Sequence, residues 1–87
     1  GMMPRSAILD RAAQVLDARA ETYGPAAASF AAVAARWSLT LGRTVTPAEV
    51  VLCMIDLKLV RLAHDPGHRD SLVDVIGYAS LLPEVQP

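Results

Sequence analysis

The sequence predicts an all-α protein built as a bundle of four helices. Of its 87 residues, 53% are hydrophobic, and the apolar residues recur at the spacings of three and four that are typical of amphipathic helices. Prolines and glycines divide the chain into four segments of helical length, and no segment shows the alternation typical of a strand. The short chain indicates a single domain, residues 1–87, with residues 1–5 and 83–87 as loose ends.

The first two helices are separated by the break at Gly24-Pro25. The first is expected from about Ser6 to Thr22, with Ser6 as its N-cap. Proline favours the first turn of a helix, so the second helix starts after this break and is expected to end at Gly42. Its many alanines predict that neighbouring helices pack on two of its sides.

The third helix has the clearest start signal in the chain. The run Thr46-Pro47-Ala48-Glu49 combines an N-cap threonine, a first-turn proline and a third-position glutamate, which is the capping-box pattern. The helix is expected to run to about His64. Because it is apolar almost all round, we expect it to be the central, most buried helix.

The fourth helix is expected to start around residues 68–70 and to end before Pro83. It contains Gly77, although glycine inside a helix costs about 1 kcal/mol relative to alanine. Gly77 therefore indicates a close helix contact or a crowded site.

Charge and composition exclude several classes of protein. A formal net charge of -1 with high hydrophobicity argues against a disordered tail and against a nucleic-acid-binding protein. The longest uncharged run in one expected helix, from Val50 to Ile55, is far shorter than the roughly 20 residues that span a bilayer. The single cysteine, Cys53, cannot form an intramolecular disulfide, is expected to be buried, and favours a cytoplasmic location.

The chain has more apolar side chains than a core of this size can bury. We therefore expect a homo-oligomer, a dimer or a tetramer, in which apolar helix surfaces meet. Trp37 could face either the internal core or the second copy.

Two cations and two carboxylates are the first candidates for a functional site. Lys58 and Arg61 share an apolar sector of the third helix, and Asp70 and Asp74 share a face of the fourth. The carboxylates could form structural ion pairs with the cations. Alternatively, they could hold a divalent metal such as Mg²⁺ while the cations contact phosphates, and for the cations we favour this phosphate role.

Three further residues allow two interpretations. Asp56, in the middle of the third helix, is either paired across an interface or part of a site. Arg19 and Tyr23 either end a solvated helix or bind a ligand, with Arg19 on a phosphate and Tyr23 stacked on a base.

His64 and His68 are separated by Asp-Pro-Gly and lack the geometry of a helical two-histidine zinc site.

Several motifs together resemble a group of short phage and prophage proteins that are similar to the MazG-like, all-α nucleoside triphosphate pyrophosphatases. The similarity spans nearly the whole chain. The motifs that carry it are Ala18-Arg19-Ala20-Glu21-Thr22-Tyr23-Gly24-Pro25, Ala35-Arg36-Trp37, Thr46-Pro47-Ala48-Glu49-Val50, Leu57-Lys58-Leu59-Val60-Arg61-Leu62, and the stretch from His68 to Ala79 with its D-S-x-x-D-x-x-G-Y pattern.

This resemblance implies a MazG-like bundle completed by oligomerisation and a Mg²⁺-dependent, or Mn²⁺-dependent, pyrophosphohydrolase acting on nucleotides. Such enzymes show E-x-x-E on one helix and E-x-x-D on the next. Asp74 matches the final aspartate, and Ser71 stands at the glutamate position before it, with Asp70 one residue earlier. The preceding helix has Lys58-x-x-Arg61 and Asp56 where the two glutamates are expected.

The predicted site residues follow from the residue pattern and the resemblance together. They are Asp70 and Asp74 as catalytic residues, these two with Asp56 as metal ligands, and Lys58, Arg61, Arg19 and Tyr23 as the nucleotide-binding residues. The alternative function is a non-catalytic helical oligomerisation or interaction module derived from the same fold.

Overall fold

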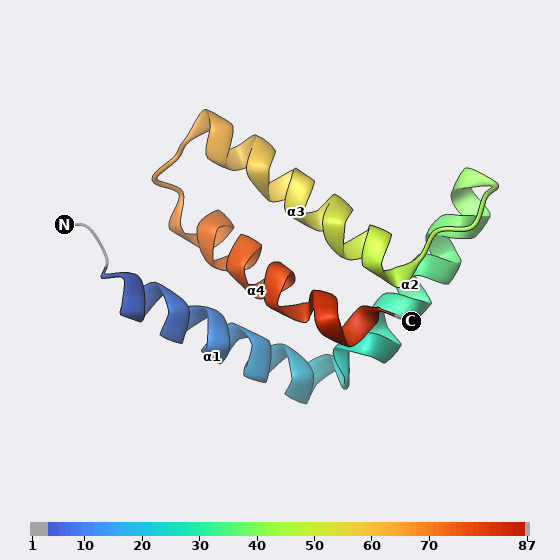
Figure 1. Ribbon diagram of the computed structural model, residues 1–87, viewed down its shortest axis with the longest axis horizontal. Coiled ribbons are helices and arrows are strands. Elements are labelled where there is room, and N and C mark those ends of the chain that lie inside the picture. Colours follow the sequence, from blue (N-terminus) through green and yellow to red (C-terminus); the bar gives the residue numbers. More distant parts are fainter. Residues whose placement is uncertain (1–3, 87) are drawn as a thin grey trace.

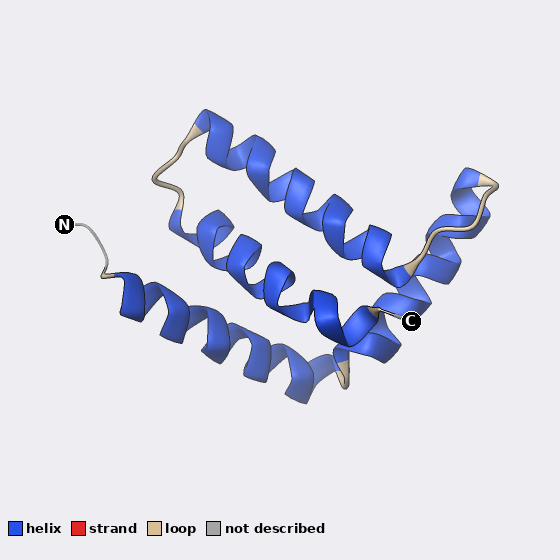
Figure 2. Cartoon of the chain, in the orientation of Figure 1, coloured by secondary structure: helices blue, strands red, loops and turns tan. Residues whose placement is uncertain are grey.

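The computed structural model describes residues 4–86, which form four helices joined by short connections (Figures 1 and 2). No strand occurs in this part of the chain. The all-α class and the number of helices are therefore confirmed. The helices are α1 (Arg5–Tyr23), α2 (Ala26–Leu41), α3 (Pro47–His64) and α4 (Arg69–Val85).

Helix α4 is the central helix of the bundle. It lies between α1 and α3 (Figure 1) and contacts α1, α2 and α3. The prediction that α3 is central is wrong, because within residues 4–86 it packs only against α2 and α4. One apolar face of α3 therefore stays uncovered within the described chain. The buried residues of α4 are Ser71, Val73, Gly77, Tyr78 and Val85, more than in any other helix of residues 4–86.

The local signals at the ends of α2 and α3 are confirmed. The Glu49 N–H donates to Thr46 Oγ1 at 3.1 Å, and the Thr46 N–H donates to Glu49 Oε1 at 3.0 Å, which completes the capping box. Gly42 ends α2 in the left-handed conformation, with φ of 70°. That backbone geometry favours glycine, so this boundary was predictable from sequence.

The outer ends of α1 and α4 differ from the prediction. Helix α1 begins at Arg5, and its N-cap is Pro4, not Ser6, because the extended Pro4 already offers its carbonyl to the Ile8 N–H at 3.2 Å. Helix α4 does not end before Pro83 but continues to Val85. Val85 is buried against Val51 and Tyr78, and this packing holds the last turn. Of the predicted loose ends, residues 1–3 and 87 lie outside the described residues.

The core consists of two neighbouring clusters. One joins α2, the α2–α3 connection and α3 through Ala34, Val45 and Val50, and the half-buried Trp37 packs against it, so Trp37 faces the internal core. The other joins α3 and α4 and includes Tyr78, whose ring meets Phe30 edge to face at 6.3 Å. None of the helices in residues 4–86 is both long and apolar enough to cross a bilayer.

Candidate functional site

Lys58 of α3 and Asp74 of α4 form an ion pair between the two antiparallel helices. Lys58 Nζ lies 2.9 Å from Asp74 Oδ2, and the two side chains are only 12% and 20% exposed. Desolvating a charge costs several kcal/mol unless a partner compensates it. The pair therefore explains how a lysine is accommodated on the apolar face of α3, and it gives Lys58 the partner that the structural interpretation expects.

The other predicted carboxylates do not converge on Asp74. Asp70 is exposed in the first turn of α4, and Asp56 is exposed on the side of α3 opposite Lys58. Within residues 4–86, no three His, Cys, Asp or Glu side chains form a group that could hold a metal ion. Because Mg²⁺ needs several oxygen ligands, the carboxylates of one chain do not fit the predicted metal.

Arg61 lies about one turn beyond Lys58 on α3 and is exposed. In the part of the chain that the structure describes, it forms no ion pair. Its guanidinium group is therefore accessible to a ligand, at the level of Asp70 on the neighbouring antiparallel helix.

Arg19 of α1 lies on the other side of α4 from Lys58 and α3 (Figure 1). Its guanidinium carbon lies 5.8 Å from the centre of the Tyr78 ring, a cation–π distance. Arg19 and Asp74 also line one shallow hollow of about 20 Å³ between α1 and α4. The structure thus brings Arg19, Lys58 and Asp74 to one region around Tyr78.

A larger pocket of about 510 Å³ opens at the connection between α1 and α2. Gly24 ends α1 with a positive φ of 79° and Pro25 precedes α2, so the two helices diverge at this point. Arg19, Phe30 and the 71% exposed Tyr23 contribute to the lining. The volume falls in the range of about 300–1,000 Å³ that is typical of small-molecule pockets.

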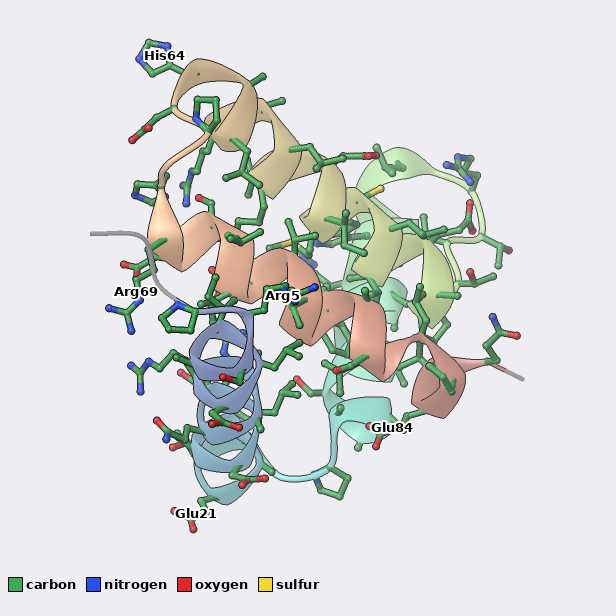
Figure 3. All side chains as sticks on the ribbon, turned by 60° about the vertical axis from the view of Figure 1, so that its left-hand side comes forward. Arg5, Glu21, His64, Arg69 and Glu84 are labelled. Carbon is green, nitrogen blue, oxygen red and sulfur yellow. The ribbon has the colours of Figure 1, made fainter. Side chains whose placement is uncertain are left out.

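The pocket carries more negative than positive charge. Arg19 is joined by the carboxylates of Asp17 and Glu84, and Glu84 projects from the last turn of α4 (Figure 3). Carboxylates accept hydrogen bonds from amino and ring N–H groups and repel phosphates. A ligand that carries both features would place its phosphates by Arg19, on the side of the shallow hollow.

Sequence reasoning identified Arg19 and Tyr23 but missed the other pocket residues. Asp17, Phe30, Ser80 and Glu84 come from α1, α2 and α4 and are far apart in sequence. No local spacing signal connects these helices. Only the tertiary arrangement gathers these side chains.

The two histidines and the cysteine lie at the ends and on the exposed side of the helices. His68 is the N-cap of α4: its Nδ1 accepts from the Ser71 N–H at 3.3 Å and lies 2.7 Å from Ser71 Oγ. His64 projects outward from the end of α3 (Figure 3). Cys53 is exposed, so its predicted burial is wrong, because it lies on the face of α3 that the chain leaves uncovered.

The fold and these charged surfaces define an all-α protein with a small-molecule-sized pocket at the α1–α2 connection and a largely buried ion pair between α3 and α4. The chain belongs to the family described as a domain of unknown function, DUF6378, whose model matches residues 7–86. It is 35% identical over 81 residues to the Gene 55 protein of Mycobacterium phage L5, and the match covers 91% of this chain and 52% of that protein. The chain thus spans about half the length of this relative. No solved structure matches it significantly.

These comparisons confirm the predicted relationship to phage proteins at the level of the family. The finer prediction of a MazG-like pyrophosphatase stays a prediction.

Proposed function

We propose that this chain binds a nucleotide, with the base in the pocket at the α1–α2 connection and the phosphates beside Arg19. The observation that carries the proposal is that Arg19 contributes to two cavities. It lines both the 510 Å³ pocket and the shallow hollow that reaches Asp74. One side chain therefore connects a cavity of base-accepting size with the hollow that Asp74 lines, and Asp74 in turn pairs with Lys58.

The pocket has the chemistry that a nucleobase requires. Tyr23 and Phe30 offer aromatic surface for contact with a planar ring. Asp17 and Glu84 offer hydrogen-bond acceptors for exocyclic amino groups. A base bound among these residues leaves its sugar and phosphates to extend along α4.

The phosphates would meet cations from two helices. Arg19 offers a planar guanidinium that can bind a phosphate through two parallel hydrogen bonds. Arg61 is exposed and is accessible to the far end of a polyphosphate. Lys58 is already paired with Asp74, so it would attract a phosphate only through the part of its charge that Asp74 does not neutralise.

The resemblance to MazG-like pyrophosphatases supports a further step, hydrolysis of the bound nucleotide to a monophosphate and pyrophosphate. The carboxylates of a single chain do not fit the Mg²⁺ or Mn²⁺ that such hydrolysis requires, because Asp56, Asp70 and Asp74 do not form a cluster. We therefore propose binding for the single chain, and hydrolysis only where a second chain supplies carboxylates.

The second candidate function is a non-catalytic helical interaction module. The Lys58–Asp74 ion pair favours it, since this pair uses the one carboxylate that matches the pyrophosphatase pattern for packing between α3 and α4. This module would have no need of the pocket.

Isothermal titration with the four common ribonucleoside triphosphates and their deoxy forms, with and without Mg²⁺, tests the proposal. We expect binding, and a loss of tenfold or more in affinity for both Arg19→Gln and Tyr23→Ala, about 1.4 kcal/mol or more. Arg11→Gln is the matched control, because Arg11 is also an exposed α1 arginine, and among residues 4–86 its side chain hydrogen-bonds to Gln14 and lines neither cavity.

Chromatography of the same mixtures reports any pyrophosphate and monophosphate formed. Binding without products supports a nucleotide-binding protein, and products with Mg²⁺ support the pyrophosphohydrolase. Absence of binding to every nucleotide in both conditions would leave the interaction module as the function.

A further inference from the structure

Helix α3 presents an apolar surface that the rest of the described chain does not cover. We call this surface the outer face of α3. Its residues are three and four positions apart, so they lie along one side of the helix, and all are exposed. They are Leu52, Cys53, Asp56, Leu59, Val60 and Ala63.

The outer face is more apolar than an ordinary solvated helix surface. Asp56 is its only charged residue, and Val60 near its centre is 70% exposed. The opposite side of α3 packs on α2 and α4 through Val50, Val51 and Lys58. Helix α3 is therefore apolar on two sides, and the chain uses one of them.

The exposed area of the molecule is larger than that of a typical monomer. A monomer of 9.3 kDa is expected to expose about 5,000 Å², from the scaling of area with mass. This chain exposes 6015 Å², an excess of about 1,000 Å². A standard protein interface removes about 800 Å² from each partner, so the excess matches what one such interface covers.

The shape leads to the same conclusion. The radius of gyration is 13.9 Å, whereas a compact domain of this length has a value of about 12 Å. The three principal extents, 46, 29 and 20 Å, describe a flat, elongated molecule with α3 along one long edge (Figure 1). A flat molecule of this kind becomes compact when a second copy packs against that edge.

We infer that a second copy of this chain covers the outer face, with the two α3 helices antiparallel about a twofold axis at Val60. Asp56 lies about one turn before Val60, and His64 lies about one turn after it. The twofold axis therefore sets Asp56 of each copy opposite His64 of the other, and the two Val60 side chains meet between these pairs. The antiparallel direction also opposes the two helix dipoles favourably.

Exposed apolar residues elsewhere in residues 4–86 offer less apolar area than the outer face. An exposed stripe on α2 has helical spacing, but four of its five residues are alanines: Ala28, Ala31, Ala32, Ala35 and Leu39. Leu39 and Leu41 near the end of α2 are exposed, but Thr40, Arg36 and Arg43 surround them in sequence with polar groups. Leu39 is 75% exposed and lies outside α3. It therefore offers a matched control for substitutions at Val60.

The inference does not depend on nucleotide binding, because the outer face lies on the side of α3 away from Asp74 and from the α1–α2 pocket. The first experiment is light scattering during size-exclusion chromatography from about 5 to 500 μM protein. The expected mass is twice the 9.3 kDa of the chain. A parent protein of 9.3 kDa throughout this range would overturn the inference.

Substitutions on the outer face locate the interface. Val60→Glu sets two carboxylates against each other at the axis and should raise the dimer dissociation constant by a hundredfold or more, while Leu39→Glu should leave it unchanged. Because Val60 is exposed in the single chain, the monomeric variant should keep its helical circular dichroism. A dimer that survives Val60→Glu and is lost with Leu39→Glu would refute this interface.

The direction of the helices has its own test. Asp56→Lys alone should weaken the dimer because it removes the carboxylate opposite His64, and His64→Glu added to it should restore the affinity through a new Lys–Glu pair. In a Cys53→Ser background, Val60→Cys should give a disulfide-linked dimer under mild oxidation, whereas Leu39→Cys should not. Failure of both the charge exchange and the crosslink would show that the dimer uses another arrangement.

Discussion

The replacement Lys58→Met measures how much the fold depends on the ion pair between α3 and α4. Methionine keeps the length and apolar stem of lysine and removes the charge, so Asp74 keeps its carboxylate without the cation 2.9 Å away. Leaving one member of a fully buried pair unpaired costs about 3–5 kcal/mol. Asp74 retains 20% exposure, and water can partly solvate it. We therefore expect a loss of about 2–4 kcal/mol, a range about 1 kcal/mol lower than that for complete burial.

In a domain of this size, each kcal/mol changes the melting temperature by about 4–8 °C. The loss is measured by urea denaturation of the parent, Lys58→Met, Asp74→Leu and the double variant. The double variant should recover most of the stability, because an apolar pair of similar volume can replace a buried ion pair at little cost. A Lys58→Met protein as stable as the parent, or more stable, would refute the structural role of the pair. It would then favour a lysine that repels Arg61 in an open phosphate site.

Three further predictions concern local features. Gly77→Ala should raise stability by about 1 kcal/mol in a denaturant melt. An added Cβ would meet Leu16 at no less than 3.8 Å, so there is room for it. A loss of stability would show that the contact with α1 needs a glycine. His68→Ala should lower stability by about 1 kcal/mol, because His68 Nδ1 accepts the Ser71 N–H at the start of α4. His68→Asn should cost much less, since asparagine can still cap the helix. The hydrogen bond from the Thr46 N–H, assisted by Arg43, lowers the pKa of Glu49 from 4.5. Ionised Glu49 therefore stabilises the fold above pH 4.5, and this stabilisation is lost as the pH falls through the lowered pKa. The stability difference between the parent and Glu49→Gln should therefore shrink on acidification, and a difference independent of pH would contradict this role.

The boundaries around α2 and α3 were predictable because their causes are local. A threonine, a proline and a glutamate within four positions satisfy the free backbone groups at the start of α3, whatever lies around it. A glycine after α2 adopts the positive φ that ends the helix. By contrast, the end of α4 at Val85 depends on contact with Val51, which lies on another helix, so the local proline signal failed.

The sequence by itself determined four amphipathic helices, the charged residues available for a site, and an excess of apolar surface. Only the tertiary structure decided that α4 occupies the centre, that Lys58 pairs with Asp74 and not with a ligand, and that Asp56 faces away from both. Helical spacing defines which residues share a face, but it does not define which faces meet. That choice depends on how closely the helices can approach one another. Helix α4 contacts the other three helices, whereas α3 contacts only α2 and α4, so one apolar face of α3 stays exposed within residues 4–86.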